Sequence, residues 1–180
     1  MSNSTDFNSP VIDCQRAHRS VRHYTDEPIT DSLLAMLIES AQSAASSSFI
    51  QAYSVVRVNR PVARERIAKA AGGQRWIEQA PVFLVCCADL RRIDLACREQ
   101  DRGELEGWSE HSLAAVVDCA LFGQNLLLGR GVHWAGGSLY RRNPHEPQVI
   151  ADELALPDLV MPVFGLCLGW PERACLGNSR

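Results

Sequence analysis

The segment from Ser109 to Leu128 constrains the fold of this chain more than any other part of the sequence. Read with the period of an α-helix, it carries apolar residues around most of its circumference, whereas a helix with one solvated side shows a single apolar stripe. A helix of this kind is buried on several sides or packs against another chain. We therefore expect a long core helix in an obligate homodimer.

Shorter segments of both types flank this helix. Apolar residues at helical spacing, bounded by Pro and Gly, predict helices over 10–17, 30–45, 61–71 and 146–154. Alternating or continuous apolar runs predict strands over 52–59, 81–88 and 159–168. The polar region from Arg91 to Gly107 has little sustained pattern and is expected to be a surface excursion. No internal repeat or linker interrupts the order, so residues 1–180 are expected to form one α+β domain.

Composition narrows the classes of partner. The chain is 46% apolar with a net charge of −3, and its pI near 5.9 argues against a protein that coats nucleic acid. The uncharged, largely apolar stretch from Leu159 to Pro171 is too short to span a bilayer, and Met1 to Pro10 lacks the features of a secretion signal. We therefore expect a cytoplasmic protein without nucleic-acid or membrane partners.

The cysteines do not indicate a disulfide framework or a metal site. Their number is odd, no Cys-x-x-Cys spacing occurs, and several lie inside apolar runs, as is typical of small buried residues. The adjacent pair Cys86-Cys87 is compatible with a redox switch, but its apolar surroundings favour a core strand. The seven positions are 14, 86, 87, 97, 119, 167 and 175.

The densest group of chemically active side chains is the run from His18 to Tyr24, which holds two arginines, two histidines and a serine. If this run is extended, His18, Ser20 and Arg22 share one face. Arginine binds a phosphate in a bidentate manner, and hydroxyl and amide donors can fill the remaining oxygens. A solvent-exposed basic turn, whose charge is balanced by the nearby Asp26 and Glu27, explains the same residues equally well.

Three further segments could contact a ligand, and each has an ordinary explanation. The hydroxyls of Ser46-Ser47-Ser48 could bind a polar ring edge, although a serine run after a helix is usually a loop. Gly72-Gly73, just before Gln74, allows close approach of a ligand but also suits a helix C-terminus. Gly136-Gly137 could lie against a flat ring or form a turn.

Taken in order, these segments resemble the nitroreductase family, and most closely its oxygen-insensitive, NADPH-dependent flavin reductase subgroup. The resemblance runs from about Ile12 to Pro171. Its most specific marks are the serine run and the segment Gly165-Leu-Cys-Leu-Gly-Trp-Pro171. It implies an α+β sandwich with a central, mainly antiparallel sheet flanked by helices, a long buried helix at the core of a homodimer, and one FMN at each end of the subunit interface.

The resemblance also implies which residues bind the cofactor. The counterparts of His18, Arg19 and Ser20 hold the flavin phosphate and ribityl chain, and the position of Arg22 lies near the ring. The counterparts of Ser46, Ser47 and Ser48 come from the partner subunit. The position of Gln74 reaches the polar edge of the ring, and the counterparts of Gly136 and Gly137 line the flavin. No catalytic side chain and no metal ligand is implied.

The implied reaction passes two electrons from NAD(P)H through FMN to a nitroaromatic, quinone or flavin acceptor by a ping-pong mechanism. The sequence departs from the family pattern where the long helix meets Gly129-Arg130-Gly131, and it ends nine residues after Pro171. We therefore expect a member without the family's C-terminal extension, with weak discrimination between NADPH and NADH. A non-catalytic or flavin-carrying homologue that retains the dimer fold is the alternative.

Overall fold

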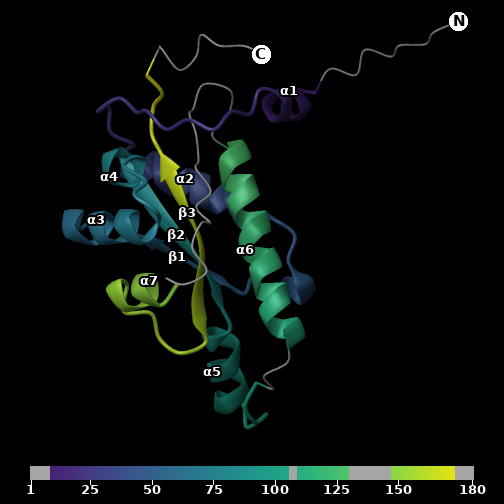
Figure 1. The fold of residues 1–180 in the computed structure, drawn as a ribbon. Helices are drawn as coiled ribbons and strands as arrows, with labels where there is room; N and C mark the ends of the chain where they lie inside the picture. Colours follow the sequence, from purple (N-terminus) through teal and green to yellow (C-terminus); the bar gives the residue numbers. More distant parts are fainter. Residues whose placement is uncertain (1–8, 106–108, 130–146, 173–180) are drawn as a thin grey trace, which may run out of the picture.

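The computed structural model describes residues 9–105, 109–129 and 147–172 of the chain (Figure 1). Its elements, in chain order, are α1 (Pro10–Arg16), α2 (Asp31–Ala41), the 3-10 turn η1 (Ser47–Phe49), β1 (Tyr53–Arg57), α3 (Pro61–Ala70), α4 (Trp76–Gln79), β2 (Val82–Asp89), α5 (Arg91–Glu99), α6 (Ser109–Gly129), α7 (Pro147–Glu153) and β3 (Val160–Leu168).

The strands of the described residues form one antiparallel sheet in the order β1-β2-β3. Tyr53 pairs with Ala88 at one end of the β1–β2 ladder, and Val82 pairs with Leu168 at one end of the β2–β3 ladder. The register of β2 and β3 shifts by one residue between Cys86 and Cys87, next to Pro162. A proline cannot donate to the ladder, so an irregularity is expected there.

Helices cover both faces of this sheet (Figure 1). Val82, Leu84 and Cys86 of β2 pack with α2 and α6 in one apolar cluster. Their neighbours Phe83, Val85 and Cys87 pack with α3, α4 and α7 in a second cluster. Successive side chains of a strand point to opposite faces, so a strand that is apolar throughout is buried on both sides. The predicted α+β sandwich is confirmed.

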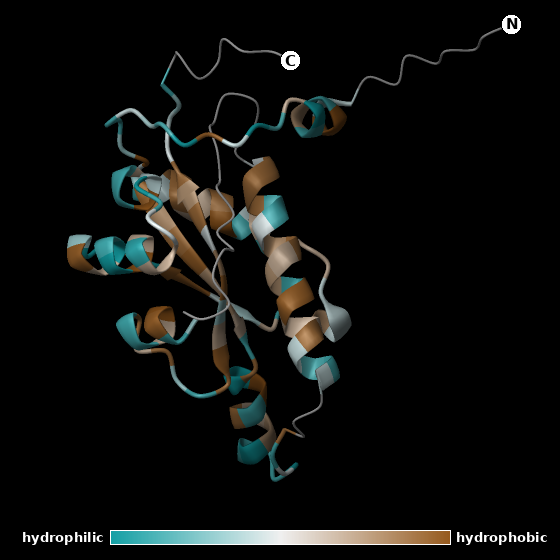
Figure 2. Cartoon of the chain, in the orientation of Figure 1, coloured by the Kyte–Doolittle hydropathy of each residue, from teal (hydrophilic) through white to brown (hydrophobic). Residues whose placement is uncertain are grey.

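The long helix α6 packs against β2 and α2, and apolar residues occur along most of its length (Figure 2). Its side chains at Ala115, Cys119, Phe122 and Leu126 are completely buried. Among the described helices, α6 alone has the length and apolar composition to cross a membrane. A core helix meets the same criterion, so this finding is weak and carries no membrane assignment.

Two predictions about elements were wrong. The region from Arg91 to Gly107, expected to lack regular structure, contains α5. Its single fully buried side chain is a carboxylate, Asp94, which explains why no apolar pattern revealed it. The second predicted helix ends at Ala41 rather than Ala45, and a turn replaces its last residues. The short helix α4 was not predicted at all.

Candidate functional site

The basic run that follows α1 is held by two buried side chains. Val21 and Tyr24 are buried, and the Tyr24 hydroxyl donates to the Val21 carbonyl at 2.9 Å. The Thr25 amide donates to the carbonyl of Trp170 at 2.9 Å, which ties this run to the residues that follow β3. His18, Arg19, Ser20 and Arg22 are all exposed. These four side chains therefore lie at the surface, beside the buried Val21 and Tyr24.

Arg22 contacts the aromatic ring of Trp76, a close neighbour of Gln74 in the sequence. The Arg22 guanidinium lies 5.4 Å from the centre of the Trp76 ring, a distance typical of a cation–π contact. Gln74 lies two residues before Trp76, and its Nε2 donates to the Ala71 carbonyl at 3.0 Å. Among the described residues no donor reaches its buried Oε1. A buried acceptor without a partner is costly, so this atom is suited to accept from a bound ligand.

The glycines before Gln74 leave room on this side of the molecule. Gly72 and Gly73 have φ values of 79° and 78°, and a Cβ atom at either position would meet nothing within 4 Å. Positive φ values strongly favour glycine. These residues end α3 as the predicted C-terminal turn.

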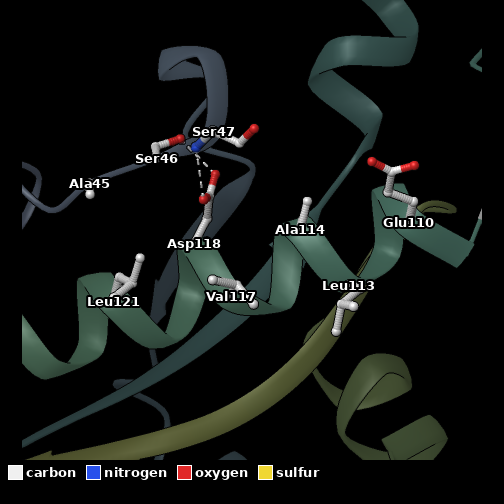
Figure 3. Close-up of a pocket in the computed structure, with 9 residues that line it drawn as sticks. All are labelled: Ala45, Ser46, Ser47, Glu110, Leu113, Ala114, Val117, Asp118 and Leu121. Carbon is white, nitrogen blue, oxygen red and sulfur yellow. Dashed lines mark hydrogen bonds between the residues drawn. The ribbon is translucent and has the colours of Figure 1, made fainter.

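The serine run lies elsewhere on the chain, beside the middle of α6 (Figure 3). The Ser46 hydroxyl donates to Asp118 Oδ2 at 2.7 Å, and the Ser47 amide donates to Asp118 Oδ1 at 3.4 Å. The side chains of Ser47 and Ser48 are exposed. Ser48 adopts a positive φ of 51°, which is uncommon for a residue with a side chain.

The two groups of candidate residues are separated along α6 within one chain. The Cys14 thiol contacts the Leu128 carbonyl at 3.6 Å, which places α1, just before the basic run, near the C-terminal end of α6. The serine run contacts Asp118, ten residues earlier on the same helix. At 1.5 Å per residue this separation is about 15 Å. Figure 1 shows the run after α1 at one end of α6 and the turn after α2 beside its middle.

An open cavity of about 510 Å³ lies beside the serine run. Three exposed leucine and valine side chains of α6 line it, at Leu113, Val117 and Leu121, with exposed fractions of 64%, 47% and 40%. Their spacing of four residues puts them on one face of the helix. Together they form the apolar stripe of α6.

Sequence analysis did not identify three residues that shape these regions, namely Asp118, Trp76 and Arg92. Asp118 is an isolated acid in an apolar helix, and that isolation was the available signal. Trp76 and Arg92 carried no such signal. Trp76 is contacted by Arg22, and Arg92 donates to the carbonyls of Gln51 and Tyr53, and these partners are distant in the sequence. Gly136 and Gly137 lie outside the described residues.

The cysteine pair of β2 is buried, as a core strand requires. Cys86 and Cys87 have no exposed surface. A thiol hydrogen bond with Cys119 and burial raise the pKa of Cys86 well above its ordinary value. Burial also raises the pKa values of Cys87 and Cys167 to about 12. Because the thiolate is the reactive form, these thiols are unsuited to redox exchange at neutral pH.

Comparison with known proteins relates the chain to a group of flavin-linked reductases. The sequence profile of the family described as "Nitroreductase family" matches residues 16–170. The oxygen-insensitive NADPH nitroreductase of Salmonella typhimurium is 42% identical over 168 residues, with 91% of this chain and 66% of that protein covered. The FMN reductase (NADPH) of Bacillus subtilis is 35% identical, with 87% of this chain and 64% of that protein covered.

Solved structures agree with the sequence comparison. The NADPH:FMN oxidoreductase of Vibrio harveyi, solved with NAD⁺, has a TM-score of 0.85 and 31% identity, with 96% of this chain and 73% of that chain covered. Nitroreductase A of Vibrio parahaemolyticus has a TM-score of 0.84 and 31% identity, with coverages of 92% and 70%. The chain thus spans slightly less than two thirds of the Salmonella and Bacillus relatives.

Proposed function

This chain belongs to the nitroreductase family, and from that premise we propose that it is an FMN-dependent oxidoreductase. It would take electrons from NAD(P)H and pass them to a small nitroaromatic, quinone or flavin acceptor. The observation that carries the proposal is the contact of the Arg22 cation with Trp76, together with the unpartnered buried acceptor of Gln74 two residues before Trp76. We place the reaction in the cytoplasm, without a nucleic-acid or membrane partner.

The exposed basic run supplies the anion-binding part of this site. We assign the FMN phosphate and ribityl chain to His18, Arg19 and Ser20, because a guanidinium fork and a hydroxyl suit phosphate oxygens. Val21 and Tyr24 bury themselves on either side of Arg22 and fix the backbone in place. The donors are therefore held at the protein surface before a ligand arrives, which lowers the entropy cost of binding.

Arg22 and Gln74 supply the part that would face the flavin ring. FMN, when bound, accepts a hydride from the nicotinamide and delivers two electrons to the acceptor in ping-pong order. The Arg22 guanidinium would stabilise negative charge at the ring edge, and Gln74 Oε1 would accept a hydrogen bond from a ring N–H. Arg22 has no carboxylate within ion-pair distance among the described residues, so its charge is available for this role.

We further propose that the active unit is a homodimer. The apolar stripe of α6 is exposed on one chain, and a second copy would cover it. The contact of α1 at Leu128 and the contact of the serine run at Asp118 lie about 15 Å apart along α6. A second chain that packs on the stripe can bring its own serine run toward the basic run of the first, so both chains would complete each site.

Purification of the full chain provides the first test. We expect a yellow protein with flavin absorbance, or an apoprotein that binds FMN in a fluorescence titration, and turnover with a nicotinamide and a quinone. Protein that binds no FMN at 100 µM, which is roughly a −5.5 kcal/mol threshold, would overturn the proposal. Protein that binds FMN and shows no turnover with either nicotinamide would support the flavin-carrying alternative.

A further inference from the structure

We propose that Asp118 is a positioning residue that holds the serine run in the shape needed to bind FMN. This inference rests on the proposed function, since it concerns how one part of the FMN site is built. The loop concerned runs from Ser46 to Ala52 and is called the serine loop below.

Asp118 joins both ends of the serine loop through one buried carboxylate. Its side chain is only 3% exposed. Oδ2 accepts from the Ser46 hydroxyl at 2.7 Å and from the Ala52 amide at 3.2 Å, while Oδ1 lies 3.4 Å from the Ser47 amide. Figure 3 shows the carboxylate pointing from α6 directly at Ser46 and Ser47. Hydrogen bonds to an ionised acceptor are stronger than neutral ones, so this carboxylate fixes the loop firmly.

The backbone of the loop needs such support. Ser48, Phe49 and Gln51 have φ values of 51°, 57° and 50°, in the left-handed region that side chains disfavour. Residues with these angles persist where the surrounding structure over-determines them. A second anchor comes from α5, where Arg92 donates to the carbonyls of Gln51 and Tyr53 at 2.5 and 2.9 Å.

The hydrogen bonds divide the three serines into two roles. The Ser46 hydroxyl donates to Asp118 and accepts from the Gln51 amide at 2.7 Å, so it is occupied within its own chain. Ser47 and Ser48 expose their side chains, and Ser47 lines the cavity beside the apolar stripe of α6, where a second copy would lie. We infer that Ser46 and Asp118 support the loop, and that Ser47 and Ser48 contact FMN.

The test compares two buried carboxylates. Asp118→Asn keeps the size of the side chain but replaces one acceptor oxygen with a donor, so it cannot reproduce all three contacts. Asp94→Asn is the matched control, because Asp94 is 5% exposed and also accepts from a backbone amide, that of Leu105, and from Arg98. Thermal unfolding of the apoprotein and FMN titration are measured for both variants. We expect Asp118→Asn to weaken FMN binding about tenfold or more, and Asp94→Asn to leave it within about twofold even if both lower the Tm.

A double-mutant cycle separates positioning from general stability. In a Ser47→Ala/Ser48→Ala background the loop has no hydroxyl to present, so Asp118→Asn should cause little further loss of FMN affinity. A general structural role would cause the same loss in both backgrounds. Ser46→Ala removes one of the same bonds and serves if Asp118→Asn does not fold; we expect it to weaken FMN binding about threefold or more.

The outcomes are distinct. Wild-type affinity in Asp118→Asn, or in Ser46→Ala when Asp118→Asn does not fold, would overturn the inference and leave the proposed function standing. A full additional loss in the double-serine background would also overturn it. A wild-type protein that binds no FMN would overturn the proposed function and this inference together.

Discussion

Tyr24 packs against Gly169 so closely that the glycine has no room for a side chain. A Cβ atom at Gly169 would lie 2.7 Å from Cδ1 of Tyr24 and 2.6 Å from Cδ of Pro81. This contact lets the run after α1 lie beside the residues that follow β3, where the Thr25 amide bonds to Trp170. The position of the whole basic run therefore depends on residue 169 being a glycine.

Replacement of Gly169 with alanine should destabilise the protein and disturb the basic run. Overpacking of a tight contact costs about 1–3 kcal/mol, and here the Tyr24 ring would have to move. Urea unfolding measures the loss of stability, and FMN titration measures the effect on the site. Gly129→Ala is the control, since a Cβ there meets its nearest atom at an ordinary 3.7 Å. Equal stabilities of the two variants would contradict the prediction.

Replacement of Arg19 or Ser20 with alanine should weaken FMN binding much more than replacement of His23. The first two are the proposed phosphate ligands, and one lost charge-assisted bond costs about 1.5–3 kcal/mol. That corresponds to roughly a ten- to hundredfold rise in Kd. Fluorescence titration of each apoprotein decides the point. Small and equal effects at the three positions would contradict this prediction and support the interpretation of the run as a solvent-exposed basic turn.

The chain should sediment as a dimer at low micromolar concentration, and Val117→Glu should shift it toward monomer. Val117 lies in the apolar stripe of α6, where a buried charge without a partner is costly. Val62→Glu is the control, because Val62 is similarly exposed but belongs to α3, on the other face of the sheet. A wild-type monomer at this concentration would refute the dimer.

The stability of the protein should fall in acid partly through Asp94. A hydrogen bond from the Leu105 amide and the pairing with Arg98 hold the pKa of Asp94 below its ordinary value of 3.8. A lowered pKa contributes stability that is present above the ordinary value and is lost as the pH falls through the native pKa. Asp94→Asn should therefore be less stable than wild type at pH 7, and the two free energies of unfolding should converge as the pH falls below the ordinary pKa of 3.8. Parallel pH curves would show that Asp94 makes no such contribution.

The buried thiols should resist alkylation in the native protein. With a pKa of about 12, Cys87 and Cys167 are ionised in only about one molecule in ten thousand at pH 8. Treatment with iodoacetamide followed by peptide mass spectrometry should label the half-buried Cys14 and Cys97 first. Denatured protein supplies the control, in which all of these positions react. Early labelling of Cys87 in native protein would mean that β2 opens readily.

Local signals were sufficient for most of the fold. Pro61 at the start of α3 and Gly72 after its end fixed that helix to within a residue, and continuous apolar runs located β2 and β3. The helix α5 was not predicted, because its buried side chain is charged and therefore produces no apolar pattern. Asp94 can be buried there because the Arg98 side chain and the Leu105 amide donate hydrogen bonds to its carboxylate in the folded chain.

The candidate site could be predicted only in part from the residues themselves. The His18 to Tyr24 run is dense enough to be noticed, although its chemistry alone left a basic turn equally plausible. The sequence could not show that the Ser46 hydroxyl is hydrogen-bonded within its own chain, since its partner Asp118 lies 72 residues further along. Contacts at that separation arise from tertiary packing and leave no local pattern.

The position of β3 near the end of the described chain has a consequence for folding during synthesis. β2 is buried on both faces, yet the ladder that joins Val82 to Leu168 cannot form until β3 has been made. At about 5–20 residues per second, the ribosome leaves β2 with one open edge for roughly 4–16 s. During this delay the strand of the sheet that is buried along its whole length has an unpaired edge, the feature that favours aggregation.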